Sequence, residues 1–321
     1  MEILRAPEGA ADGLADYPTE RRFVEIPAGD GQQLRVHVVD AGDPEAPVVV
    51  FLHGNPSWSF LWRHQIAAVV AAGHRAVAPD LVGMGLSDTP SQMEDYTVAR
   101  HVDWMRAVLF EALDLRDVTM VLHDWGGIIG LRLAADHPDR VARIVVSNTG
   151  LPWRDLDEPL PATIEAGGPL ADFQAFAAAA PVWEPWTLLP MVMETEPSAA
   201  VIAGYRAPYP DGSRTIGSRA FTQLLPTRPD NPMYPANHAA WQVLDTWTKP
   251  LLTIFSDRDT VAPDGWKPLV ARIPGAAGQP HVILEGAGHF LQEDRPEAYT
   301  AALLDWLGDD RERPGRTEDA R

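Results

Sequence analysis

Asp124 is the residue whose type and setting point most directly to a reaction. It lies in the run Val-Thr-Met-Val-Leu-His-Asp-Trp-Gly-Gly (118–127). A carboxylate with an ordinary pKa of about 3.9 is an anion at neutral pH. It can therefore attack an sp³ carbon without a base and form an alkyl ester with the protein. The glycines that follow favour a sharp strand-to-helix turn that exposes the side chain. The competing interpretation is an aspartate that caps a helix N-terminus.

A base that would hydrolyse such an ester is His289, within Leu-Glu-Gly-Ala-Gly-His-Phe-Leu (284–291). Imidazole readily takes a proton from water near neutral pH, and the glycines before it suit a loop that presents the ring. The chain has ten histidines, so a purely structural loop histidine is the alternative. The position of His289 after the last expected strand favours its role as a base, whereas we expect His53 and His123 to shape loops.

An imidazole base needs a carboxylate that holds its tautomer and stabilises its cation. Asp259 lies in Ile-Phe-Ser-Asp-Arg-Asp-Thr-Val-Ala-Pro (254–263), and Asp257 competes with it two residues earlier. The spacing to Ser256 and Pro263 favours Asp259, while Asp257 fits a turn-forming role. The resulting order along the chain is nucleophile, acid and histidine, as in α/β-hydrolases.

Two neutral hydrogen-bond donors flank the expected nucleophile. Asn55 follows His53-Gly54, and Trp125 follows Asp124 directly. Their backbone N–H groups are expected to form the oxyanion hole. Their side chains carry an amide NH₂ and an indole N–H, which cannot ionise, and they would stabilise a departing halide ion. The alternative is that Asn55 shapes a turn and Trp125 fills a cavity wall.

The elements that must position these residues alternate between strands and helices. Expected strands are Leu34–Asp40, Val48–His53, Arg75–Asp80, Val118–Asp124, Val141–Ser147, Leu251–Ser256 and His281–Glu285. Expected helices are Phe60–Ala72, Val98–Leu113, Gly127–Ala135 and Pro296–Leu307. Such alternation predicts an α/β fold with a mainly parallel central sheet flanked by helices.

The alternation stops after residue 150, which divides the chain. Residues 1–150 and 231–308 are predicted to form the two parts of the α/β core, and 151–230 an inserted helical cap, or lid, over the strand ends where open α/β sheets bind ligands. The polar residues 309–321 are predicted to be a disordered tail. Weak candidates for an apolar pocket wall in the cap are Phe173, Phe176, Trp183 and Leu189, with core packing as the alternative.

Composition excludes several classes of function. The 321 residues carry 26 Lys and Arg against 45 Asp and Glu, a net charge of −19 that repels nucleic acid and anionic membrane surfaces. No cysteine is present, so disulfides and thiolate chemistry are excluded. No signal peptide and no uninterrupted apolar run long enough to cross a membrane is evident, so we expect a cytoplasmic protein.

Four segments resemble those of the haloalkane dehalogenases of the α/β-hydrolase superfamily. They are His-Gly-Asn-Pro-Ser-Trp-Ser-Phe-Leu-Trp-Arg (53–63), residues 79–88, His-Asp-Trp-Gly-Gly (123–127) and residues 288–297. The resemblance covers roughly 20–150 and 245–308. It implies Asp124 as nucleophile, His289 as base, Asp259 as acid, and Asn55 with Trp125 as halide ligands.

The sequence departs from some family members at two places. Some carry a glutamate after the sixth strand, where this chain has Asn148 and no carboxylate. Some use a cap tryptophan as a halide donor, where this chain has Phe176, so Asn55 becomes the expected second donor and Trp183 or Trp186 the substitutes to consider.

The resemblance implies hydrolysis of a small apolar haloalkane to an alcohol, halide ion and a proton, with no metal or organic cofactor. An epoxide hydrolase with the same triad is the main alternative, with Tyr205 and Tyr209 available as acids for the epoxide oxygen. A coelenterazine-oxidising luciferase and a non-catalytic receptor on the same fold are further alternatives. Chain-length preference, physiological substrate and oligomeric state are not predicted.

Overall fold

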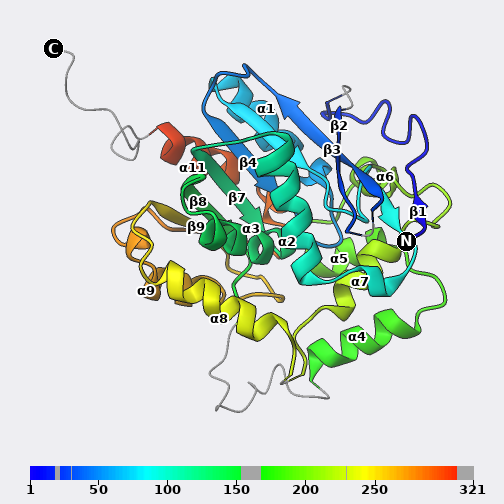
Figure 1. Ribbon diagram of the computed structural model, residues 1–321. Coiled ribbons are helices and arrows are strands. Elements are labelled where there is room, and N and C mark those ends of the chain that lie inside the picture. The colour runs from blue at the N-terminus through cyan, green and yellow to red at the C-terminus, as the bar shows by residue number, and fades with distance from the viewer. Residues whose placement is uncertain (19–21, 30, 153–167, 229, 309–321) are drawn as a thin grey trace.

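A twisted eight-stranded sheet forms the centre of the molecule (Figure 1). The computed structural model describes residues 1–18, 22–29, 31–152, 168–228 and 230–308. The strand order is β10-β9-β8-β7-β4-β5-β3-β2. The strands are β2 (Arg22–Pro27), β3 (Gln33–Ala41), β4 (Val48–Leu52), β5 (Arg75–Pro79), β7 (Val118–His123), β8 (Val141–Ser147), β9 (Leu251–Ser256) and β10 (Val282–Leu284). A separate two-stranded ribbon pairs β1 (Ile3–Leu4) with β6 (Thr89–Pro90).

The sheet is parallel from β5 to β10 and antiparallel only at β3 and β2. The fold is therefore the predicted α/β-hydrolase fold with a mainly parallel sheet. All seven expected strands are present, but β2 at the sheet edge was not foreseen. Only Ile26 of β2 is buried, so this strand lacks the apolar run that marks the central strands.

Successive residues of the central strands serve two different cores. In β4, Val50 and Leu52 join the core on one face, whereas Val49 and Phe51 join the core on the other. This alternation follows from the two-residue period of a strand, and it requires both faces to be covered by helices. The sequence meets that requirement with near-continuous apolar strands.

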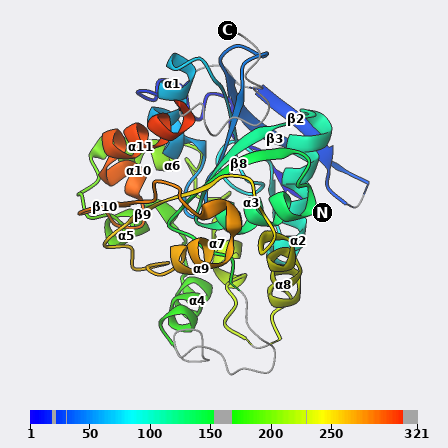
Figure 2. The ribbon, with the colours of Figure 1, turned by 90° about the vertical axis from the view of Figure 1, so that its left-hand side faces the viewer.

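Helices cover both faces of the sheet (Figure 2). On one face α1 (Arg63–Ala71) packs against α11 (Pro296–Gly308). On the other face α3 (Trp125–Asp136) packs against α2 (Val98–Arg106) and α8 (Met233–Leu244). The π-helical turn Ala107–Ala112 extends α2, and α9 spans Trp266–Arg272. One-turn helices occur at Ser59–Trp62 (η1), Met93–Asp95 (η2), Pro274–Ala276 (η5) and Leu291–Asp294 (α10).

The described residues between β8 and α8 form helices and turns without a strand. They contain α4 (Pro169–Ala179), η4 (Pro185–Leu188), α5 (Leu189–Val192), α6 (Ala199–Arg206) and α7 (Ile216–Gln223). The predicted boundaries of the cap at 151 and 230 stay predictions, since residues 153–167 and 229 lie outside the described residues. The predicted tail, 309–321, also lies outside them.

Buried ion pairs and hydrogen bonds fasten these helices to the sheet domain. Glu293 accepts a bidentate pair of hydrogen bonds from Arg63 at 2.6 and 2.8 Å and a third from the Tyr205 hydroxyl of α6 at 2.8 Å. Asp294 accepts the backbone N–H groups of Glu194 and Thr195. Charge-assisted bonds of this kind are stronger than neutral ones, so the α5–α6 segment is held firmly against α10.

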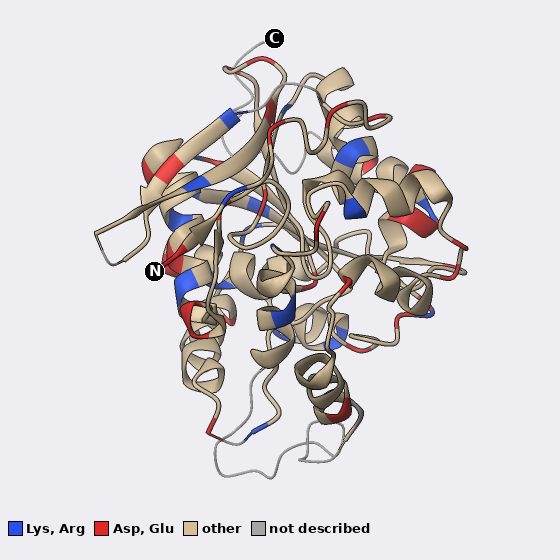
Figure 3. Cartoon of the chain, turned by 90° about the vertical axis from the view of Figure 1, so that its right-hand side faces the viewer, with Lys and Arg blue, Asp and Glu red and all other residues tan. Residues whose placement is uncertain are grey.

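Acidic residues are spread over helices and loops around the molecule rather than gathered on one element (Figure 3). Over the described part of the chain, no helix combines the length and apolar character needed to cross a membrane.

Candidate active site

Asp124 lies at a strained turn between β7 and α3. Its φ of 50° and ψ of −125° place an L-residue in a sparsely populated region, at a cost of about 1–3 kcal/mol. The turn requires glycine on both sides of the site. A Cβ on Gly126 would lie 2.3 Å from the Leu52 carbonyl oxygen, and one on Gly54 would lie 2.1 Å from Asp124 Oδ1. Asp124 precedes α3 but makes no side-chain cap, so its carboxylate is free for other contacts.

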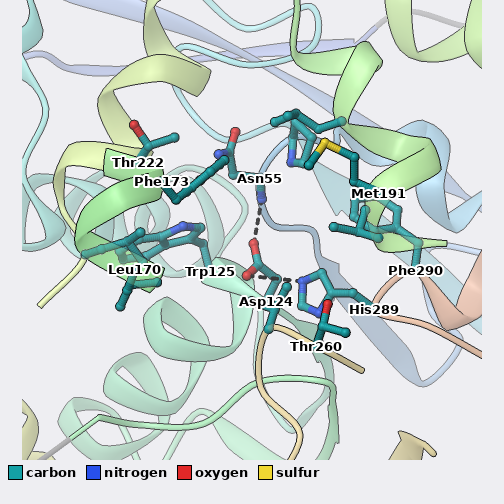
Figure 4. A pocket seen from close by; sticks show the side chains of 15 residues that line it. Asn55, Asp124, Trp125, Leu170, Phe173, Met191, Thr222, Thr260, His289 and Phe290 are labelled. Atoms are coloured by element: carbon teal, nitrogen blue, oxygen red, sulfur yellow. Dashed lines mark hydrogen bonds and ion pairs between the residues drawn. The ribbon is translucent and has the colours of Figure 1, made fainter. Parts of the chain in front are cut away.

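The two carboxylate oxygens of Asp124 have different surroundings (Figure 4). Oδ1 accepts the backbone N–H of Asn55 at 2.7 Å. Oδ2 lies 3.4 Å from His289 Nε2, which can pair with it as an ion when the ring is protonated but makes no hydrogen bond. The Thr149 hydroxyl donates to the Asp124 carbonyl at 2.6 Å and steadies the backbone of the turn. One oxygen is thus fixed by a hydrogen bond, while the other faces an imidazole nitrogen that makes no hydrogen bond.

Asp259, and not Asp257, lies against the histidine. His289 Nδ1 is 3.0 Å from Asp259 Oδ1, and the backbone N–H groups of Val261 and Ala262 donate to the same carboxylate at 2.8 and 3.2 Å. Asp257 instead accepts the backbone N–H of Gly286 at 2.7 Å and shapes the loop that carries His289. The arrangement sets Nδ1–H toward Asp259 and leaves Nε2 to face Asp124.

The two carboxylates control the charge of the buried imidazole. Burial by itself lowers the pKa of His289, but Asp259 and Asp124 outweigh it and raise the pKa to about 10. Burial raises the pKa of Asp124, while His289 and the Asn55 N–H lower it more, so its pKa lies below the ordinary value. The pKa of Asp259 is lowered in the same way by His289, against burial. Both carboxylates therefore favour the protonated form of the His289 ring.

The loop of His289 rests on the segment that ends α5. The His289 N–H donates to the Val192 carbonyl at 2.8 Å, and Gly288 allows that approach because a Cβ there would lie 2.7 Å from the same oxygen. Asn148 donates from its amide to the carbonyls of Gly288 and His289 at 2.9 and 3.0 Å. Sequence reasoning noted Asn148 only for lacking a carboxylate. The available signal in the sequence was an asparagine directly after an apolar strand, because asparagine tolerates a left-handed φ such as the 40° found at Asn148.

His53 and His123 are structural and uncharged. His53 lies between the Gly54 carbonyl, at 2.8 Å from Nδ1, and the Leu81 N–H, at 2.9 Å from Nε2. His123 Nε2 lies 2.8 Å from the His289 carbonyl. Burial lowers the pKa of both rings, that of His123 to about 4. Neither ring forms a hydrogen bond with the carboxylate of Asp124.

An apolar cavity of about 440 Å³ opens above Asp124 (Figure 4). This volume suits a small organic molecule. Its lining residues are Asn55, Pro56, Asp124, Trp125, Leu170, Phe173, Leu188, Met191, Val192, Thr222, Leu225, Thr260, Val261, His289 and Phe290.

Of the four predicted wall residues, only Phe173 lines this cavity. Phe176 is 59% exposed and lies outside it, because α4 turns that position to solvent. Trp183 is buried behind the wall, where its ring packs near Phe173. Leu189 is buried in a sheet-side core, and its neighbour Leu188 takes the place at the wall. The prediction that these three residues line the wall is therefore wrong, and for Trp183 and Leu189 the core-packing alternative holds.

Asn55 and Trp125 both contribute to the cavity wall. Asn55 Oδ1 accepts a hydrogen bond from the Ser218 hydroxyl at 2.7 Å. The Trp125 ring packs on Phe221 at 5.2 Å, and no hydrogen bond within the described residues engages its indole N–H. The backbone N–H of Trp125 begins α3, where helical N–H groups lack intrahelical partners. The site thus has neutral donors on one side and a carboxylate–imidazole pair on the other.

Tyrosines and metal ligands do not add to this chemistry in the described part of the chain. The Tyr205 hydroxyl donates to Glu293, and the Tyr209 hydroxyl accepts the Gly85 N–H at 3.0 Å, so both point away from the cavity. The described residues contain no group of three or more histidine and carboxylate side chains suited to a metal ion.

Comparisons with known proteins agree with the fold. Residues 47–183 match the family model of the α/β hydrolase fold. The chain is 46% identical to haloalkane dehalogenase 1 of Mycobacterium bovis over 95% of this chain and 99% of that one. It is 42% identical to a haloalkane dehalogenase of Psychrobacter cryohalolentis over 96% and 99%. A tetrameric haloalkane dehalogenase structure from Paraglaciecola agarilytica superposes with a TM-score of 0.84 at 28% identity, covering 96% and 99% of the two chains.

Proposed function

Since the chain belongs to the haloalkane dehalogenases, hydrolases that act on carbon–halide bonds, we propose that Asp124 is its nucleophile, His289 its base and Asp259 the acid that orients the base. The observation that carries this assignment is the unequal setting of the Asp124 oxygens. One is held by the Asn55 N–H, and the other lies 3.4 Å from His289 Nε2, which makes no hydrogen bond. That geometry suits formation and hydrolysis of an ester at one carboxyl group.

In the first step, Asp124 attacks the halogen-bearing carbon of a small haloalkane in the cavity. A C–O bond forms as the carbon–halogen bond breaks, and the electron pair leaves with the halide. The amide NH₂ of Asn55 and the indole N–H of Trp125 stabilise that ion. Neutral donors suit this task because a cationic donor would pair with Asp124 and weaken its attack.

Esterification changes the charge beside His289 and thereby prepares the second step. The ester has no negative charge, so one of the two carboxylates that raise the pKa of His289 is lost. Burial then opposes the protonated ring more effectively, so the ring favours its neutral form and its proton passes to solvent. The neutral form, which can act as a base, is thus favoured once there is an ester to hydrolyse.

In the second step, neutral His289 takes a proton from water, and the hydroxide attacks the carbonyl carbon of the Asp124 ester. The developing oxyanion is held by the backbone N–H groups of Asn55 and Trp125, while Asp259 stabilises the imidazolium. Collapse of the intermediate breaks the bond between the carbonyl carbon and the alkyl oxygen. The leaving oxygen takes a proton from the His289 imidazolium to give the alcohol, and the proton of the new carboxyl group returns to His289, which restores the Asp124 carboxylate. The balance is one haloalkane and one water converted into alcohol, halide and a proton.

We further propose that residues 151–230 act as a cap that closes the apolar cavity over Asp124. Leu170, Phe173, Leu188 and Met191 support this role because they come from that segment and line the wall. An apolar wall excludes water and favours halogenated hydrocarbons over charged substrates.

The alternative of an epoxide hydrolase has no support. That reaction needs an acid for the epoxide oxygen. The Tyr205 hydroxyl donates its hydrogen to Glu293, and the Tyr209 hydroxyl lies against the Gly85 backbone, outside the cavity. None of the residues lining the cavity is a tyrosine.

The test is to trap the ester. His289→Ala should complete the first step with a bromoalkane and stop, so mass spectrometry should find one alkyl group on the peptide containing Asp124, with one bromide released per protein. The exposed His238 offers a matched control, since His238→Ala should turn over without an adduct. An unmodified Asp124 peptide in His289→Ala, together with bromide turnover by the unaltered protein, would disprove the mechanism.

A further inference from the structure

A chain of two buried hydrogen bonds lies behind Asn55. The indole N–H of Trp183 donates to Ser218 Oγ at 3.1 Å, and the Ser218 hydroxyl donates to Asn55 Oδ1 at 2.7 Å. Ser218 is 1% exposed and Trp183 is 6% exposed, so both side chains are shielded from water, whereas Asn55 is half-buried at the cavity wall. In such surroundings hydrogen bonds are stronger and can polarise one another.

The chemistry of the three groups sets the direction of the chain. An indole N–H can only donate, so Ser218 Oγ accepts from Trp183 and keeps its single hydrogen for another partner. That hydrogen goes to the amide oxygen of Asn55. The amide is planar, so fixing its oxygen toward Ser218 turns its NH₂ group away from Ser218. Trp183 and Ser218 together thus select one of the two amide orientations of Asn55.

Ser218 is held in place by a helix that is locked to the sheet domain. In the first turn of α7, a Cβ on Gly217 would lie 2.2 Å from the Gly83 carbonyl oxygen, so glycine permits close backbone contact. Just before α7, Arg214 donates to the carbonyls of Gly85 and Pro208 at 3.1 and 2.9 Å. The hydroxyl of Ser218 therefore has a fixed position relative to Asn55.

The same helix also supports the second proposed halide donor. Phe221, one turn after Ser218, packs against the ring of Trp125 at 5.2 Å. Residues three apart on a helix lie on the same face, so α7 presents both contacts toward the cavity. Helix α7 thus touches both donors through separate side chains.

We propose that Ser218 is a positioning residue for halide departure and that Trp183 orients its hydroxyl. The inference rests on the proposed role of Asn55 as a halide ligand. The indole N–H of Trp183 then stabilises the halide indirectly, because it orients the Ser218 hydroxyl and thereby the amide of Asn55, and it makes no direct contact with the ion. It explains how this chain uses a cap tryptophan although Phe176 stands outside the cavity.

The first test measures halide binding with sodium bromide and sodium chloride by quenching of tryptophan fluorescence. Ser218→Ala should raise the Kd for halide by about five- to tenfold, the effect of losing one buried hydrogen bond. The exposed Ser213 on the preceding turn is the matched control, and Ser213→Ala should leave the Kd unchanged. An unchanged Kd in a folded Ser218→Ala variant would overturn the proposal.

The second test asks whether Trp183 acts through Ser218. Trp183→Phe keeps the ring and removes the N–H, so the Kd should rise about two- to fivefold, while Trp186→Phe, whose ring stacks on Tyr209, should not change it. In the double variant, Trp183→Phe should add no further loss to Ser218→Ala, because the two act on one chain of bonds. Additive losses would show that Trp183 acts independently and would overturn this part of the proposal.

A third measurement separates positioning from general damage and from the proposed function. Ser218→Ala should slow ester formation more with a chloroalkane than with the matching iodoalkane, because chloride is the stronger hydrogen-bond acceptor. Hydrolysis of the ester should keep its rate, since the backbone N–H of Asn55 is retained. Asn55→Ala completes the set. If it leaves the halide Kd unchanged, the halide role of Asn55 is wrong; if it weakens binding while Ser218→Ala does not, only the positioning proposal fails.

Discussion

The sheet side of the cavity and the helical side differ in what determines their geometry. On the sheet side, Asp124, Asn55 and His289 sit on turns whose backbone atoms are in close contact, and Gly54 and Gly126 have no room for a Cβ. On the helical side, Leu170, Phe173 and Met191 are apolar side chains on short helices, and Met191 is 71% exposed. The comparison indicates that backbone geometry sets the reaction, whereas loosely constrained side chains set the shape of the pocket.

The largest loss is expected on the sheet side at Asp259. Asp259→Asn should lower the rate of ester hydrolysis by roughly 10²–10⁴-fold, because an amide can no longer hold the tautomer and stabilise the imidazolium. Asp257, two residues earlier, provides the control: Asp257→Asn keeps an oxygen that can accept the Gly286 N–H and should cost far less. Equal losses in the two variants would contradict the assignment of Asp259.

The same variant makes a prediction about pH. Ester hydrolysis needs neutral His289, so its rate should rise with pH through the pKa of that ring in the ester. This pKa should lie below about 10, the value in the resting site, because Asp124 is then uncharged. Asp259→Asn removes the remaining carboxylate that raises the pKa of His289. The increase of the hydrolysis rate with pH should therefore occur at lower pH, and the maximum rate should fall. Single-turnover decay of the ester at several pH values measures both, and a rise displaced to higher pH would refute the electrostatic account.

A smaller effect, on stability, should follow from filling the glycine positions. Gly126→Ala places a Cβ 2.3 Å from a backbone oxygen and should lower the free energy of unfolding by about 1–3 kcal/mol. Gly308→Ala is the control, because no atom lies within 4 Å of its added Cβ, and its effect should stay within about 0.5 kcal/mol. Denaturant unfolding compares them, and equal stability of both would mean that the turn at Asp124 is not tightly constrained.

The same difference explains which features could be predicted from sequence. The seven expected strands and the positions of Asp124, Asp259 and His289 at strand ends followed from apolar runs and from glycines at fixed offsets. Those signals are local, because a strained turn needs particular residues beside it. The strand β2 has no such signal, since only Ile26 of it is buried.

On the helical side, no local pattern in the sequence marks which residues face inward. Phe173 and Phe176 are three residues apart on α4, yet one lines the cavity and the other is exposed. Their difference arises from how α4 packs on α7, which is a tertiary effect without a local signal. The hydrogen bond from Ser218 to Asn55 joins residues 163 positions apart, and no pattern along the chain marks it.

A modest, substrate-dependent effect is expected at the wall. Phe173→Ala removes an aromatic contact, so KM for short haloalkanes should rise about fivefold, while longer or branched substrates should gain relative to them. Phe176→Ala, three residues away and exposed, is the matched control and should leave KM unchanged for every substrate. Steady-state halide release over a series of bromoalkanes tests this, and an unaltered substrate order in Phe173→Ala would mean that the helical side does not shape the pocket.

The smallest expected effect is at Phe176 itself, and it tests the comparison most directly. Phe176→Trp introduces an indole N–H at the position where some family members carry a halide-binding tryptophan. Because this side chain is 59% exposed and lies outside the cavity, the added N–H should not reach a halide, and the Kd for bromide should stay within twofold of the original. A several-fold tighter Kd would mean that α4 turns inward when halide binds. The helical side would then take part in the reaction itself, and the division between a reacting sheet side and a shaping helical side would no longer hold.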